Sequence, residues 1–157
     1  MSLVKTYSNF SYWFIQQKAY DKAESLFSRA LLLFNEDTNH TLYYSGQTAK
    51  IYVFMGYIRV LQNDTKSEDY FRKAINIFEY NYKIDPLHSL NEFTPILMNI
   101  PNIYLEVQND ARFEEYVNYI LKKSEPVLEI SEYSGWVIKI VDELKKLGEI
   151  RSLRKIY

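Results

Sequence analysis

The spacing of the apolar residues constrains the fold more than any other feature of this chain. From Tyr7 onward they recur at steps of three and four, the period of an amphipathic helix, and no segment alternates with a period of two for long enough to predict a strand. Glycine and proline number only four each, too few for the dense turns of a β-sandwich or β-barrel. The 157 residues match the usual length of one domain. The sequence therefore predicts an all-α fold in a single domain, residues 1–157.

Polar turns divide this pattern into about seven helices, which we expect to pair as antiparallel hairpins. Thr65 and Glu68 have the spacing of a capping box before one of these helices. Pro95 and Pro101 fall inside another, and we expect them to bend or split it because an interior proline removes a backbone hydrogen bond. The expected helices are residues 4–17, 21–35, 41–62, 66–82, 87–107, 109–123 and 125–147.

Residues 26–34 and 70–78 repeat one another at an offset of 44 residues. The matching pairs are Phe27 with Phe71, Ala30 with Ala74, and Phe34 with Phe78. A third unit, residues 100–122, keeps the helix–turn–helix length and has Tyr119 where the alanine belongs. Small residues let paired helices approach closely while aromatic rings fill the gaps between hairpins, so the pattern favours a helical repeat over a generic bundle.

The spacing of Ala23, Phe27 and Ala30 resembles the second-helix signature of the tetratricopeptide repeat. The first-helix signature is matched by Tyr7, Phe10, Ser11 and Phe14 in one copy, and by Tyr52, Met55, Gly56 and Arg59 in the next. Two features depart from the family pattern: the repeat is longer than the usual length of about 34 residues, and Asn35 and Glu79 replace the helix-ending proline. The resemblance implies a right-handed superhelix (an α-α solenoid) with units at residues 4–35, 41–82 and 87–123 and a C-terminal helix at 125–147.

Residues 49–57, followed by a polar turn and by residues 70–79, resemble the carboxy-terminal helical-repeat domains of Rgg/MutR-type transcription regulators of Gram-positive bacteria. The likeness covers roughly residues 5–120. In that family an amino-terminal helix-turn-helix reads DNA, and the repeat domain dimerises and binds a short signalling peptide on its concave side. No helix-turn-helix signature precedes Tyr7. The resemblance therefore implies a cytoplasmic sensor domain for quorum-sensing peptides that makes no direct contact with nucleic acid.

In a repeat of this class, the first helix of each hairpin lines the concave surface. Projecting the pattern onto this chain predicts a peptide-binding surface of eight residues: Tyr12, Gln16, Lys50, Val53, Tyr57, Met98, Asn102 and Leu105. Asparagine and glutamine each donate and accept hydrogen bonds, which suits a peptide backbone, and tyrosine adds rigid contact area with a polar tip. The sequence leaves open the alternative that several of these side chains pack between helices.

No motif in the sequence has the pattern of a catalytic or metal-binding site. There is no cysteine, and the two histidines, His40 and His88, stand 48 residues apart without a carboxylate spacing typical of a metal pair. The four glycines are too scattered for a phosphate-binding loop. We therefore expect a protein that is not an enzyme and that uses no metal or cofactor.

Charge and hydropathy narrow the class of partner. Nineteen Lys and Arg against 20 Asp and Glu give a net charge of −1, whereas chains that bind nucleic acid through phosphates usually carry a basic excess. No stretch approaches the ~18 apolar residues of a membrane span. We expect a short peptide or protein segment as the partner. Residues 127–144 carry more apolar side chains than one buried stripe needs, which indicates either a homodimer or a capping helix that is buried on two sides within the monomer. A plain tetratricopeptide-type adaptor without a DNA-binding half stays open as the alternative.

Overall fold

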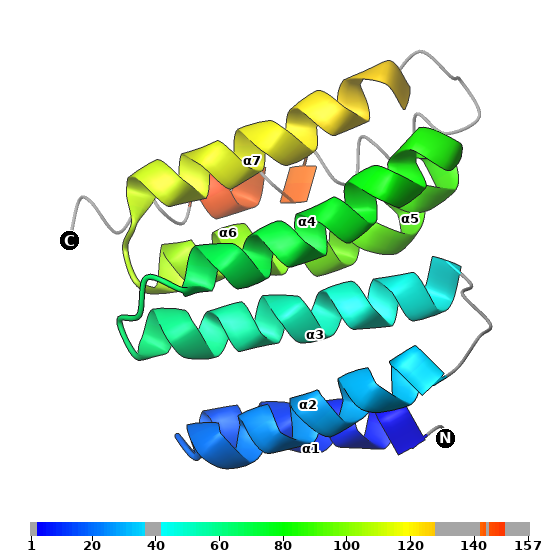
Figure 1. Cartoon of the computed structure of the whole chain (residues 1–157). Helices are drawn as coiled ribbons and strands as arrows, with labels where there is room; N and C mark the ends of the chain where they lie inside the picture. The colour runs from blue at the N-terminus through cyan, green and yellow to red at the C-terminus, as the bar shows by residue number, and fades with distance from the viewer. Residues whose placement is uncertain (1–2, 37–41, 128–141, 144, 150–157) are drawn as a thin grey trace. The chain divides into compact units, whose positions relative to one another are not determined.

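The computed structural model describes residues 3–36, 42–127, 142–143 and 145–149. In this part of the chain every regular element is a helix, which confirms the all-α prediction (Figure 1). The elements are α1 (Leu3–Gln16), α2 (Tyr20–Glu36), α3 (Leu42–Leu61), α4 (Ser67–Ile84), α5 (Pro86–Leu97), α6 (Asn99–Glu106), α7 (Asp110–Ser124) and the 3₁₀ turn η1 (Glu125–Val127). The α1–α2, α3–α4 and α6–α7 pairs pack as helical hairpins. The helix expected over residues 125–147 lies mostly outside the described residues.

Two compact units make up the chain, residues 1–96 (unit 1) and residues 97–157 (unit 2). Unit 1 contains α1 to α4 and almost all of α5, and unit 2 contains α6, α7 and η1. Within unit 1, α3 packs against α2 on one side and against α4 on the other (Figure 1). The expectation of a single domain over residues 1–157 stays a prediction.

The same turn closes all three hairpins. The first helix of each hairpin is followed, two residues after its end, by a residue with a positive φ: Lys18 (58°), Asn63 (54°) and Gln108 (59°). In each turn the amide of this residue donates to the carbonyl three residues earlier, and the next amide donates to the carbonyl five residues earlier, at 2.8–3.3 Å. This is the Schellman pattern of a helix C-terminus. Because the three residues are spaced 45 positions apart, the chain has a structural repeat of 45 residues.

The second helices of unit 1 bury the positions that the sequence alignment pairs. The buried side chains are Ala23, Phe27, Ala30 and Phe34 of α2 and Ser67, Phe71, Ala74 and Phe78 of α4. The offset between these two sets is 44 and not 45 because α4 has one residue fewer after the turn. Gly56 of α3 lies against α4, where an added Cβ would come within 2.4 Å of the Phe71 ring. The glycine is therefore what lets this ring pack directly against the backbone of α3.

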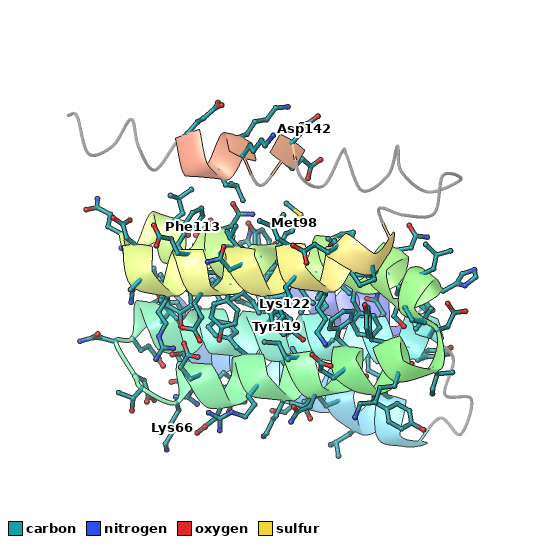
Figure 2. The ribbon with its side chains drawn as sticks, turned by 90° about the horizontal axis from the view of Figure 1, so that it is seen from above. Lys66, Met98, Phe113, Tyr119, Lys122 and Asp142 are labelled. Carbon is teal, nitrogen blue, oxygen red and sulfur yellow. The ribbon has the colours of Figure 1, made fainter. Side chains whose placement is uncertain are left out.

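The third hairpin corrects one expected position. In α7 the side chains of Phe113, Tyr116, Ile120 and Ser124 are buried. Ile120 stands as far from the shared turn as Ala30 does, so the expectation that Tyr119 takes the alanine position is wrong by one residue. The residue that α4 lacks after its turn is present in α7. Tyr119 is half-buried (labelled in Figure 2), and the Lys123 ammonium lies 5.8 Å from its ring centroid.

Proline divides the helix expected over residues 87–107, as predicted. α5 ends at Leu97 and α6 begins at Asn99. Pro95 lies inside α5, and its missing N–H removes one helical hydrogen bond. Pro101 lies in the first turn of α6. Backbone N–H groups in a first turn have no acceptor within the helix, so the proline removes no helical hydrogen bond there.

The start of α4 differs from the expected capping box. Thr65 does not cap the helix; the Asp64 carboxylate instead accepts the backbone N–H of Lys66 at 3.0 Å. The backbone amide of Asp64 also donates the second hydrogen bond of the Schellman turn after α3, to the carbonyl of Arg59. One residue thus ends one helix and supports the beginning of the next (Lys66 is labelled in Figure 2).

Candidate functional site

The eight residues predicted to bind a peptide divide between the two units and between surface and core. Unit 1 contains Tyr12, Gln16, Lys50, Val53 and Tyr57, and unit 2 contains Met98, Asn102 and Leu105. The side chains of Tyr12, Gln16 and Asn102 are exposed, and that of Lys50 is half-buried. The other four, Val53, Tyr57, Met98 and Leu105, are buried.

The buried members of the set are core residues in this conformation. Val53 has no exposed surface, and Tyr57 is 9% exposed. Both belong to α3, which is covered by α2 and by α4, so its apolar side chains are enclosed from two sides. Packing between helices, the alternative that the sequence left open, therefore describes them.

Two of the more accessible members come together around a ring that the sequence analysis did not single out. The ring centroids of Tyr12 and Phe54 lie 5.5 Å apart at an interplanar angle of 59°. The ammonium of Lys50 lies 5.9 Å from the Phe54 centroid. An aromatic edge and a cation are both favourable neighbours of a ring face. Tyr12, Lys50 and Phe54 thus form one cluster across α1 and α3, called the groove cluster below.

Phe54 is held in place by a contact with α2, the second helix of the first hairpin. Its ring stacks on that of Phe27, which is fully buried in α2, with centroids 6.0 Å apart and planes inclined by 8°. A ring fixed in this way needs no rearrangement before it contacts a ligand. The signal that could have identified it is the helical period, since Lys50 and Phe54 are four residues apart and therefore share a face of α3.

The electrostatics of the groove cluster favour an anionic ligand. Lys50 forms no ion pair with any residue that the structure describes, and its contact is the ring of Phe54. Neither α1 nor α3 contains an aspartate or glutamate, whereas α2 and α4 each contain three. Among these four helices the carboxylates thus lie only on the second helices, and the carboxylate that approaches α3 from α5 is that of Glu92, beside Gly46.

A second charged cluster holds the two hairpins of unit 1 together. The Arg59 guanidinium of α3 forms an ion pair with Glu24 of α2 at 2.5 Å, and both side chains are about one-quarter exposed. The same guanidinium lies 6.0 Å from the Tyr70 ring centroid, and the Lys73 ammonium lies 5.3 Å from it. Because these residues connect α2, α3 and α4, we assign this cluster to the stacking of the hairpins.

His88, the histidine that the structure describes, forms a hydrogen-bonded pair with Asp85 at the start of α5. His88 is exposed, and its Nδ1 lies 2.7 Å from Oδ2 of Asp85, the residue before α5. The other oxygen of Asp85 accepts the backbone N–H of His88 at 3.2 Å, so the carboxylate caps the helix. These hydrogen bonds, the backbone one first, lower the pKa of Asp85 below its ordinary value. His40 lies outside the described residues.

The described part of the chain contains neither a candidate metal cluster nor a helix that could span a membrane. No group of three or more His, Asp or Glu side chains there is arranged to hold a metal ion. No helix there is long and apolar enough to cross a membrane. Comparisons of the chain with protein-family models, with curated proteins and with solved structures found no match.

Proposed function

We propose that this chain is the ligand-sensing domain of a cytoplasmic transcription regulator, and that the groove cluster binds a short, extended peptide. The observation that carries the peptide site is the shared contact of Tyr12 and Lys50 with the ring of Phe54. First helices of two successive hairpins thereby contribute to one accessible surface. The regulator part of the proposal rests on the resemblance of residues 49–57 and 70–79 to the sensor domains of Rgg/MutR-type proteins.

The chemistry of the cluster defines the expected peptide. Lys50 lacks a carboxylate partner among the described residues, so it attracts an aspartate, a glutamate or a C-terminal carboxylate. Tyr12 is 46% exposed and offers an apolar ring with a polar tip, which suits a neighbouring apolar side chain. Gln16 is exposed one helical turn further along α1 and can both donate to and accept from a peptide backbone. We therefore expect an acidic residue next to an apolar one in the bound segment.

The experiment is selection of a displayed library of random linear octapeptides on the full chain. We expect enrichment of peptides in which an acidic residue neighbours an apolar one. A double variant, Tyr12→Ala with Lys50→Gln, is expected to weaken binding of the enriched peptides by about thirtyfold or more, because truncating an anchor side chain commonly costs about 2 kcal/mol or more. Tyr80→Ala, which removes an exposed tyrosine from α4 (69% exposed, against 46% for Tyr12), is the control and is expected to bind normally.

Circular dichroism melts of the three proteins separate lost binding from lost folding. If the double variant selects and binds the same peptides as the unchanged chain, the groove cluster is not the site. If no peptide is enriched, the short-peptide ligand is wrong. The regulator is tested separately at the gene: a helix-turn-helix encoded in frame before Met1 supports it, and its absence supports the plain adaptor.

A further inference from the structure

Glu92 of α5 is a half-buried carboxylate without a partner of opposite charge in the described part of the chain. It forms no hydrogen bond or ion pair with any residue that the structure describes. His88, one turn earlier on the same helix, is engaged with Asp85 at 2.7 Å. A carboxylate that loses part of its hydration without gaining a cation or a donor is unfavourable. Glu92 is therefore suited to a cation that a ligand brings.

The side chain of Glu92 lies against α3, over Gly46. A Cβ at Gly46 would meet an oxygen of this carboxylate at 2.9 Å and Cγ of Glu92 at 3.1 Å. Because Gly46 has no side chain, the carboxylate approaches the helix backbone directly. Gly46, Lys50 and Phe54 follow one another at steps of four and therefore lie on one side of α3. The carboxylate thus lies on the same side of α3 as two members of the groove cluster.

The carboxylate and the Lys50 ammonium are separated along α3. The ammonium lies near the ring of Phe54, 5.9 Å from its centroid, whereas the carboxylate lies at Gly46. At about 1.5 Å per residue, Lys50 and Phe54 stand about 6 Å and 12 Å from Gly46 along the helix axis. An extended peptide advances about 3.3 Å per residue. Peptide groups that pair with both charges are therefore about two to four residues apart.

We infer that Glu92 determines the specificity of the groove cluster by pairing with a lysine, an arginine or the N-terminal ammonium of the bound peptide. The inference rests on the proposed peptide site and extends the expected peptide: an acidic residue next to an apolar one has a cation about two to four residues away. A peptide with an acidic group at that distance instead would meet Glu92 with a like charge and would be rejected.

The test is a charge swap between the chain and the peptide. Random linear octapeptides are selected on the unchanged chain and, separately, on Glu92→Lys. We expect a basic residue about two to four positions from the acidic one on the unchanged chain, and a second acidic residue in its place on Glu92→Lys. Changing the basic residue of one enriched peptide to glutamate should raise its Kd for the unchanged chain by about tenfold or more, and Glu92→Lys should restore binding.

Two further variants separate the charge of Glu92 from other effects. Glu92→Gln keeps the size of the side chain and removes its charge, so it should lose the preference for a basic residue. Asp69→Lys changes the net charge as much as Glu92→Lys does, at an exposed carboxylate of α4, and should select the same peptides as the unchanged chain. Circular dichroism melts of all variants show whether each one folds.

The outcomes distinguish a failure of this inference from a failure of the peptide site. Enriched peptides that depend on Tyr12 and Lys50 but lack a basic residue at this spacing would overturn the inference alone, as would identical selections on Glu92→Lys and on the unchanged chain. A lower Tm of Glu92→Gln with an unaltered peptide preference would mean that the carboxylate only stabilises the N-terminal part of α3, where negative charge is favourable. If no peptide is enriched on the unchanged chain, both the peptide site and this inference are wrong.

Discussion

At the scale of single residues, one glycine controls how closely α3 and α4 can approach each other within their hairpin. Gly56 faces the ring of Phe71, a fully buried side chain with no room to move aside. We expect Gly56→Ala to lower the free energy of unfolding by about 1–3 kcal/mol, the usual cost of overpacking a core. Urea denaturation followed by circular dichroism measures it.

Two other glycines provide graded controls for Gly56→Ala. A Cβ at Gly46 would meet the flexible carboxylate end of Glu92 at 2.9 Å, so Gly46→Ala should cost less. A Cβ at Gly148 meets nothing within 4 Å, and alanine there should be neutral or stabilise its helix by up to about 1 kcal/mol. Equal effects of all three substitutions would show that helix propensity, and not the contact with Phe71, decides.

The cap at Asp85 gives a second prediction at this scale, concerning pH. Hydrogen bonds from His88 lower the pKa of Asp85 in the folded protein, so its stabilising contribution is complete above the unfolded pKa and is lost as pH falls through the folded pKa. An NMR titration of the Asp85 carboxyl should therefore have its midpoint below the ordinary value of 3.8. Asp85→Ala should lower Tm at neutral pH, and the difference from the unchanged chain should shrink in acid.

The control for the Asp85 prediction is Asp85→Asn, which can still cap the helix but does not titrate. Its Tm at neutral pH should lie closer to that of the unchanged chain than Tm of Asp85→Ala does. A difference between Asp85→Ala and the unchanged chain that is constant down to pH values well below the carboxyl midpoint would contradict a role for the ionised form.

At the scale of the elements, the three closing turns carry strain that glycine would relieve. Lys18, Asn63 and Gln108 all have a Cβ in the left-handed region, which costs roughly 1–2 kcal/mol. Glycine avoids that cost but loses about 0.4–1 kcal/mol of backbone entropy on folding. We therefore expect Lys18→Gly and Gln108→Gly each to stabilise the fold by about 0.5–1 kcal/mol, and Asn63→Gly by less, since asparagine tolerates this region.

Thermal denaturation of each single variant tests the turn prediction. Gln17→Gly is the matched control, because Gln17 precedes Lys18 and does not have a positive φ. Glycine at position 17 should lower Tm, because it adds backbone entropy to the unfolded chain and relieves no positive φ. If Lys18→Gly and Gln17→Gly lower Tm alike, the turn after α1 does not have the Schellman geometry in solution.

At the scale of the whole molecule, the division into two units predicts independent opening. Residues 1–96 and 97–157 each form a compact unit. A destabilising substitution in one unit should therefore lower the free energy of local opening more in that unit than in the other. In native-state hydrogen exchange, Gly56→Ala should accelerate exchange of the amides of α3 and α4 more than those of α6 and α7. Equal acceleration in both units would mean that the chain unfolds as one cooperative domain, as the sequence analysis expected.

The spacing of apolar residues and the positions of the prolines predicted the helices, because these features lie within each helix's own sequence. The segment expected over residues 66–82 is α4, Ser67–Ile84, and the segment expected over 109–123 is α7, Asp110–Ser124. The small and aromatic pairs at Ala30 with Ala74 and at Phe27 with Phe71 are all buried, because spacing alone places them on one helical face. The prolines likewise predicted the division between α5 and α6.

By itself, then, the sequence determined the fold class, the hairpins and the buried stripes of α2 and α4, all of which depend on residues close together in the chain. Only the tertiary structure decided which first-helix residues reach the surface, because α3 is apolar on nearly every side and its neighbours determine what is covered. Val53 and Tyr57 are buried there, whereas Phe54 joins Tyr12 and Lys50. The sequence also did not reveal the 45-residue repeat. The positions that define it share a positive φ but are three different residue types: lysine, asparagine and glutamine.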